Sequence, residues 1–246
     1  MKKPFVFDTK QYYYEPHQHN DKNGTYKRAS CPALNTLANR GFIPRTGRNV
    51  TYENMAQSMR DVFNFGDDND DKVQHATNCP AAPTRLDKGI GDNININMTL
   101  FNQLLSFSKD GETLSLEDLA EHHHLRHNQS RAESSNWQFG NQDATAQYTN
   151  LVGMIGRNGK YGLQTLYVED LKQFYLDGDL PTAYQRRELP YYAVEATILN
   201  DRMSHHIGYQ INRPFPPWDH NGTDVEPLVA KYEQRSGPSG SVLSTA

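Results

Sequence analysis

The stretch RASCPALNTLANRG, residues 28–41, contains the clearest helix signal in the chain. Pro32 directly follows Cys31, and proline is favoured at the first position of a helix because its missing N–H needs no partner there. Apolar residues then recur at helical spacing, and Gly41 stands where a glycine commonly follows a helix. The stretch therefore predicts a helix from Pro32 to Arg40, with Cys31 at its N-terminus.

A cysteine in this position has a defined chemistry. Cys31 would lie beside free backbone N–H groups and the positive end of the helix dipole. Both stabilise a thiolate over a thiol, so we expect a lowered pKa for Cys31. Such a thiolate is a nucleophile or a metal ligand, and a small buried cysteine without function is the alternative. For Cys79, the other cysteine in the chain, we expect a free thiol, with an intermolecular disulfide as the alternative.

Composition limits the class of protein. The chain has 246 residues and a formal net charge of −4, and no basic patch indicates nucleic acid. No apolar run approaches the length of a membrane helix. Helical spacing recurs and no strand pattern is strong, so we expect a mainly α, single globular domain with long loops and few or no strands. We expect an extended arm over residues 1–25, the domain over 26–235 and a disordered tail over 236–246.

Further helices are predicted along the chain from apolar spacing and capping residues. Thr51 is expected to cap the second helix and Gly66 to close it, and Ser115 is expected to cap a later one. An acidic cluster at 67–72 is expected to be a solvated loop. The predicted helices after the first one cover residues 51–66, 95–107, 116–124, 147–157, 165–175, 190–203 and 225–235.

Four histidines are concentrated in EHHHLRHNQSR, residues 121–131. His123 and His127 have the i, i+4 spacing of zinc ligands on a helix. A zinc protease of this kind needs a glutamate directly after the first histidine, and His124 stands there instead, so this class is disfavoured. A zinc or nickel site of another kind stays open. We expect His122 and His124 to be surface or capping residues.

Glu195 lies in the middle of the apolar run YYAVEATIL, residues 191–199. The carboxylate lies either on an exposed stripe or in a pocket of low polarity that raises its pKa. A raised pKa is how acid–base residues are adjusted to their task. The sequence leaves both alternatives open.

Three segments together resemble a known family. They are RASCPALNTLANRGFIPRTGRNVT at 28–51, LAEHHHLRHNQS at 119–130 and AVEATIL around Glu195. Over about residues 25–205 the chain is similar to the fungal heme-thiolate peroxidases, the family of chloroperoxidase and the short unspecific (aromatic) peroxygenases. It departs from the family pattern at Ser30, where the family has proline, and at Arg40, where it has histidine.

The resemblance implies heme b as the cofactor, with Cys31 as the axial thiolate ligand of the iron. Glu195 would be the distal acid–base that moves a proton on hydrogen peroxide and leads to an oxo-iron intermediate. His127 would hydrogen-bond to Glu195 and orient it. The resemblance places the remaining predicted residues around the heme, with Arg28, Leu34, Arg126 and Ser130 binding it and Leu125, Val194 and Ile198 lining the substrate pocket.

One departure from the family concerns a structural ion. The family has Glu-His-Asp where this chain has Arg126-His127-Asn128, and that glutamate and the serine matched by Ser130 help to bind magnesium or manganese against a heme propionate. An arginine does not ligate a cation. We therefore expect the structural ion to be absent and Arg126 to pair with the propionate directly.

The expected function is oxidation of small organic substrates by oxygen transfer from hydrogen peroxide, with halide oxidation or one-electron peroxidation left open. A tailoring oxidase of a biosynthetic pathway and a heme-binding protein with little catalysis are the alternatives. The expected partners are peroxide and a small organic substrate, without nucleic acid or membrane, in a monomer or homodimer. The resemblance implies secretion, but the apolar stretch in MKKPFVFD is too short for a signal peptide, so the location stays open.

Overall fold

The computed structural model describes residues 8–17, 24–67, 82–87, 90–133, 141–157 and 165–208, with the side chains of 141–145 excluded. Most of these residues are helical, which confirms the predicted mainly α class. None of the helices in this part of the chain combines the length and apolarity of a membrane span. The helices are α1 (Pro32–Arg40), α2 (Tyr52–Phe63), α4 (Met98–Leu105), α5 (Leu116–Glu133), α6 (Asn141–Ile155), α7 (Val168–Lys172), the π-helical turn η3 (Gln173–Asp177) and α8 (Ala193–His206).

Several predictions concern residues outside these ranges. They are Cys79, most of the acidic cluster at 67–72, the helix at 225–235 and the tail at 236–246. Two short strands, β1 (Thr113–Ser115) and β2 (Thr165–Tyr167), pair antiparallel. The helix predicted at 165–175 is therefore wrong in its first three residues, which form β2.

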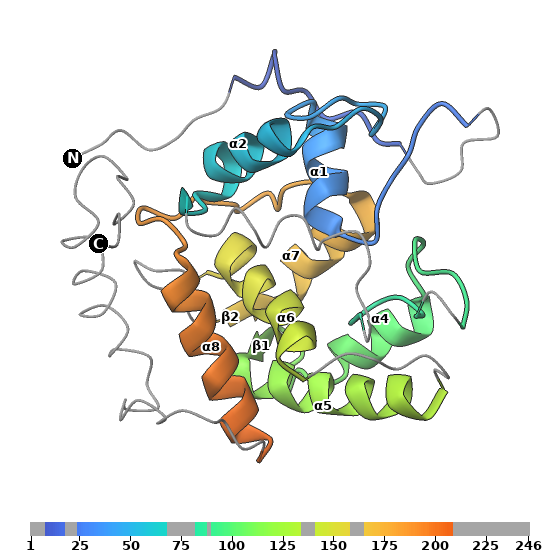
Figure 1. Ribbon diagram of the computed structural model, residues 1–246, viewed down its shortest axis with the longest axis vertical. Helices are drawn as coiled ribbons and strands as arrows, with labels where there is room; N and C mark the ends of the chain where they lie inside the picture. The colour runs from blue at the N-terminus through green and yellow to red at the C-terminus, as the bar shows by residue number, and fades with distance from the viewer. Residues whose placement is uncertain are drawn as a thin grey trace, which may run out of the picture.

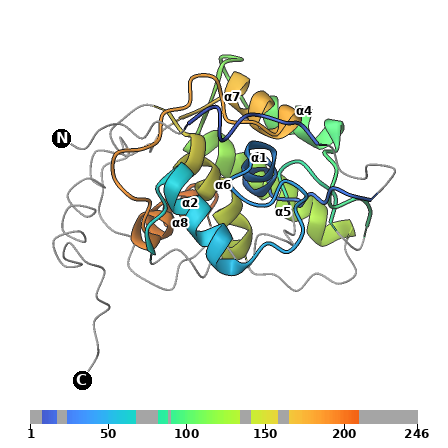
Figure 2. The same ribbon diagram turned by 90° about the horizontal axis from the view of Figure 1, so that it is seen from above.

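Three helices form the centre of the molecule. α6 packs against α5 and α8, and α5 also contacts α8. In Figure 1, α6 lies in the middle of the ribbon, with α8 to its left and α5 below it. Seen from above in Figure 2, α1 and α2 lie over these helices. Large buried side chains from several elements share one core, among them Phe63, Phe101, Tyr148, Phe174 and Tyr191.

The predicted starts of α1, α2 and α5 are confirmed, whereas α4, α6, α7 and α8 begin three to six residues away from the predicted positions. The Thr51 side chain accepts from the N–H of Asn54 at 3.2 Å and caps α2. α2 ends at Phe63 with Asn64 in the left-handed conformation (φ 56°), which asparagine tolerates. Gly66 therefore does not close the helix as predicted, and its N–H donates to the carbonyl of Tyr191 at 3.0 Å.

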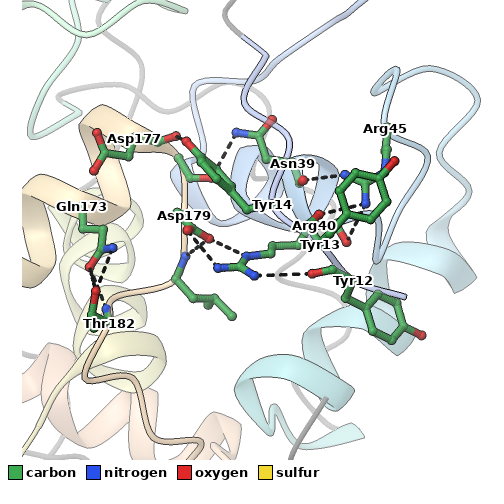
Figure 3. Close-up of polar contacts among 12 residues, drawn as sticks. Tyr12, Tyr13, Tyr14, Asn39, Arg40, Arg45, Gln173, Asp177, Asp179 and Thr182 are labelled. Carbon is green, nitrogen blue, oxygen red and sulfur yellow. Dashed lines mark hydrogen bonds and ion pairs between the residues drawn. The ribbon is translucent and has the colours of Figure 1, made fainter. Parts of the chain in front are cut away.

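The N-terminal segment 8–17 lies across the C-terminal end of α1 (Figure 3). The Tyr14 hydroxyl donates to the carbonyl of Asp177 at 2.6 Å. Arg45 donates to the carbonyl of Tyr13 at 2.9 Å, and its guanidinium carbon lies 3.9 Å from the centroid of the Tyr13 ring. These contacts attach the first described residues to η3 and to the loop that follows α1.

Arg40, the last residue of α1, forms an ion pair with Asp179 in the same region (Figure 3). Its Nε and Nη2 donate to the two carboxylate oxygens at 2.6 and 2.9 Å. The two side chains are 17 % and 11 % exposed, so most of this bidentate pair is removed from water. The arginine at this departure from the family pattern thus joins α1 to the segment that follows η3.

Arg40→Ala should lower the free energy of unfolding by about 2–4 kcal/mol, because it leaves the mostly buried Asp179 carboxylate without its bidentate partner. Denaturant titration measures the loss, and Asp179→Ala combined with Arg40→Ala should cost less than the sum of the single variants. The matched control is Arg48→Ala, whose exposed guanidinium donates to the carbonyl of Thr25. This control should change stability by less than about 0.5 kcal/mol. Equal losses for Arg40→Ala and Arg48→Ala would contradict the assignment.

Candidate active site

Cys31 stands at the N-terminal end of α1, where the sequence places it. It is the N-cap residue with an extended backbone (φ −79°, ψ 117°), and Pro32 follows as the first helical residue. The backbone N–H groups of Leu34 and Ala33 lie close enough to lower the pKa of the thiol, although neither meets the geometry of a capping hydrogen bond. The position of Cys31 at the helix end is therefore as predicted.

The predicted direction of the Cys31 pKa is wrong for the free thiol. Burial raises this pKa above its ordinary value and outweighs the backbone N–H groups and the positive charge of Arg85, which lower it. The residue packs against the hydrophobic core, and the sequence does not show this apolar contact. A metal ion on the sulfur would reverse the balance, because a coordinated thiol loses its proton outright.

Glu195, in the first turn of α8, is fully buried and hydrogen-bonded to Arg187. Nη2 of Arg187 donates to the two carboxylate oxygens at 2.9 and 2.7 Å, and both side chains are almost completely removed from solvent. Burial raises the pKa of Glu195 to about 7, although the charge of Arg187 and its hydrogen bond lower it. The sequence left open whether Glu195 lies on an exposed stripe or in a pocket of low polarity, and in the structure it is buried.

Sequence reasoning missed Arg187. It lies in an irregular segment before α8, where Nδ2 of Asn64 donates to the carbonyls of Arg187 and Glu188 at 3.0 and 3.2 Å. An arginine eight residues before a carboxylate follows neither a helical nor a strand period. The available signal was that a buried Glu195 needs a cation or hydrogen-bond donors as partners.

The ring of Tyr191 lies against the Arg187 guanidinium of the same pair. The guanidinium carbon of Arg187 lies 5.0 Å from the ring centroid. The Tyr191 hydroxyl donates to the carbonyl of Thr149 at 3.0 Å, and a Cβ placed on Gly153 would lie 2.8 Å from the ring. Because no real Cβ sits that close, the ring rests on α6 at a position that requires glycine.

The predicted hydrogen bond between His127 and Glu195 is not found. Among the described residues, the Glu195 carboxylate forms its hydrogen bonds with Arg187. His127 is buried on α5, and burial is the main cause that lowers its pKa. In this structure the hydrogen-bond partner of Glu195 is therefore Arg187 and not His127.

The other histidines of α5 divide between interior and surface. His124 is exposed, as expected, and its Nε2 lies 3.0 Å from Nδ2 of Asn128. His122 is fully buried, so the expected surface position is wrong for it. His123 is also fully buried, and neither of its ring nitrogens has a hydrogen-bond partner in the part of the chain that the structure describes.

Arg126 and Ser130 join α5 to the segment 82–87. Arg126 donates to the carbonyl of Ala82 at 3.1 Å and to Oε1 of Gln129 at 2.6 Å. Ser130 donates to the carboxylate of Asp87. Both residues are buried, and their contact with a heme propionate or an ion stays a prediction.

The remaining predicted residues lie on α1, α5 and α8 and beside α1. Arg28 donates to Oδ1 of Asn39 at 3.1 and 2.6 Å and to the carbonyls of Lys27 and Arg45 at 2.7 and 3.0 Å, so it holds the loop after α1. A propionate would have to replace some of these partners. Leu34 and Ile198 are buried, whereas Leu125 and Val194 are partly exposed.

Cys31 provides the one kind of ligand that a heme needs from the protein. The iron of heme already has four porphyrin nitrogens, so a single soft ligand such as the free Cys31 thiol completes a site of this kind. In the same segment, the buried hydroxyls of Ser30 and Thr36 lack hydrogen-bond partners among the described residues. Buried polar atoms of this kind often mark a place for a ligand or water.

Comparison with known proteins adds the family. No curated protein matches the chain. A family model described as "Peroxidase, family 2" matches residues 11–76 and 71–189. The matched residues include Cys31, His127 and Arg187, and they end before Glu195. Because the match spans most of the chain, and the helical fold agrees with it, the chain belongs to peroxidase family 2, whose members are oxidoreductases that act on peroxide.

Proposed function

We propose that the protein is a heme-thiolate peroxygenase or peroxidase that uses hydrogen peroxide to oxidise small organic substrates, and that residues 26–235 form its catalytic domain. The buried Glu195 carboxylate, with a pKa of about 7 and Arg187 as its partner, carries the proposal. A group that both takes up and releases a proton works best when its pKa lies near the working pH. Surface carboxylates do not meet this condition.

Cys31 is proposed as the protein ligand of heme b. Heme would supply the iron that activates peroxide, and a thiolate ligand favours cleavage of the O–O bond. Because burial makes the free Cys31 thiol a weak acid, the thiol keeps its proton until the metal binds. Binding of the metal then displaces the proton. Leu34 and Ala33 then present their N–H groups to the negative sulfur and stabilise it.

Glu195 is proposed as the acid–base residue, with Arg187 as its positioning partner. The ionised carboxylate accepts a proton from peroxide at one of its oxygens and returns it to the departing oxygen. Arg187 stabilises the ionised state and fixes the direction of both carboxylate oxygens. Val194 and Ile198 flank Glu195 on α8 and, with Leu125, are proposed to restrict access to it.

The pH dependence of the reaction with peroxide tests Glu195. The rate of peroxide consumption by the heme-loaded protein should rise with pH through a midpoint near 7, because only the ionised carboxylate accepts a proton. Glu195→Gln should remove this dependence and lower the rate by roughly 10²–10⁴-fold. Arg187→Met should move the midpoint to higher pH, because the positive charge of Arg187 lowers the Glu195 pKa and its removal raises it. Glu188→Gln, at an exposed acid nearby, is the control and should leave the midpoint in place.

An optical spectrum of the purified, heme-loaded protein tests Cys31. The reduced carbon-monoxide complex should have the absorption typical of thiolate-ligated heme, because the sulfur is the axial ligand. Cys31→His should keep heme and lose that band, whereas Cys79→Ser, at the other cysteine of the chain, should keep it. A protein that takes up no heme, or a band that survives in Cys31→His, would overturn the proposed function.

A further inference from the structure

Tyr148 of α6 and His122 of α5 form a hydrogen-bonded pair inside the helical core, where these two helices pack side by side (Figure 1). The Tyr148 hydroxyl and Nδ1 of His122 are 3.0 Å apart, and neither side chain has exposed surface. The Tyr148 ring meets the rings of His122 and His123 edge to face, at centroid distances of 5.8 and 5.5 Å. The chemistry proposed for Glu195 uses none of these three residues.

The neighbouring polar groups indicate where the proton of this pair lies. A neutral imidazole has one N–H and one bare nitrogen. If Nδ1 of His122 donated, both the Tyr148 O–H and the bare Nε2 would lack partners among the described residues. If Tyr148 donates to Nδ1 of His122, only the Nε2–H of His122 lacks a partner among the described residues. The second arrangement leaves fewer buried polar groups unsatisfied, so the phenol proton points at a basic nitrogen.

The surroundings keep the pair uncharged at rest. Burial, together with a smaller contribution from the charge of Arg126, lowers the pKa of His122 to about 3. Burial raises the pKa of Tyr148 well above its ordinary value. Ordinary changes of pH therefore leave both groups neutral, and a proton moves to His122 only when Tyr148 itself becomes a much stronger acid.

We propose that Tyr148 and His122 are a redox-active pair, in which Tyr148 gives up one electron and His122 accepts its proton. Loss of an electron makes a phenol a strong acid, so the O–H bond of Tyr148 breaks and an N–H bond forms at Nδ1 of His122. The products are a neutral tyrosyl radical and an imidazolium, and the oxidant is reduced by one electron. Reduction of the radical by an organic electron donor returns the proton to the phenol oxygen.

The oxidant is the one that the reaction with peroxide generates, and in this respect the inference rests on the proposed function. Neighbouring residues connect the pair with Cys31. Tyr175 acts on the pKa of Tyr148, and the guanidinium carbon of Arg85 lies 5.8 Å from the Tyr175 ring centroid. The charge of Arg85 in turn acts on Cys31. In this role the pair would discharge an oxidant that forms when no substrate is bound.

Electron paramagnetic resonance of the full-length protein tests the pair in two arms. The first arm applies a photogenerated ruthenium(III) polypyridyl complex, a one-electron oxidant that needs neither heme nor peroxide. We expect a long-lived tyrosyl signal with an exchangeable proton coupling from the hydrogen bond, and narrowing of this signal in protein made with ring-deuterated tyrosine. The second arm mixes the heme-loaded protein with hydrogen peroxide and should give the same signal.

Variants assign the radical. Tyr148→Phe should lose the long-lived signal, and His122→Asn should also lose it, because the amide keeps a hydrogen-bonding group but does not take up the proton. Tyr184→Phe is the matched control and should keep it, because the Tyr184 hydroxyl donates to the carbonyl of Val62 at 2.5 Å and faces no base in that bond. Thermal unfolding by circular dichroism confirms that each variant is folded, and the deuterated wild-type protein needs no variant.

The outcomes separate the two proposals. Two outcomes would overturn the redox pair, whatever the protein does with peroxide. One is the absence of a long-lived tyrosyl signal in the first arm, and the other is the persistence of that signal in Tyr148→Phe. A signal that appears in the first arm and depends on Tyr148 supports the pair. If the second arm then consumes no peroxide, the proposed function fails and the pair stands.

Discussion

A carboxylate taken out of water is costly unless a cation and hydrogen-bond donors compensate for the lost hydration. For Glu195 this compensation comes from Arg187, and the structure around the pair serves to hold the arginine. Asn64, in its left-handed conformation at the end of α2, binds the backbone of Arg187, and Tyr191 lies against the guanidinium. Two segments far apart in the sequence, the end of α2 and residues 187–195, therefore meet at one ion pair.

The helix that begins at Pro32 was predictable because local chemistry decides it, and so was the Thr51 cap. The Cys31 pKa was not, because helix-end amides and burial act in opposite directions and only the amides are visible in the sequence. Arg187 also escaped prediction. It acts across an irregular segment, and no periodicity relates its position to that of Glu195.

Helix α5 shows a second limit of sequence reasoning. Its buried face carries polar side chains, among them His122, His123 and Arg126. The helix therefore has no apolar stripe from which the sequence could reveal the buried face. The resemblance selected His127 on this helix by alignment. The structure instead pairs Glu195 with Arg187 and Tyr148 with His122, because packing, not order along the chain, determines which donors meet which acceptors.

The absence of a side chain at Gly153 lets the Tyr191 ring lie directly against the backbone of α6. The ring in turn sets how near an aromatic face lies to the guanidinium of Arg187, and this cation helps to set the acidity of Glu195. A methyl group added to Gly153 would push the Tyr191 ring outward. The displacement would pass through Tyr191 and Arg187 to Glu195, which the methyl group itself does not touch. The basicity of the site is therefore adjustable from the last turn of α6, a helix that contributes no side chain to the ion pair.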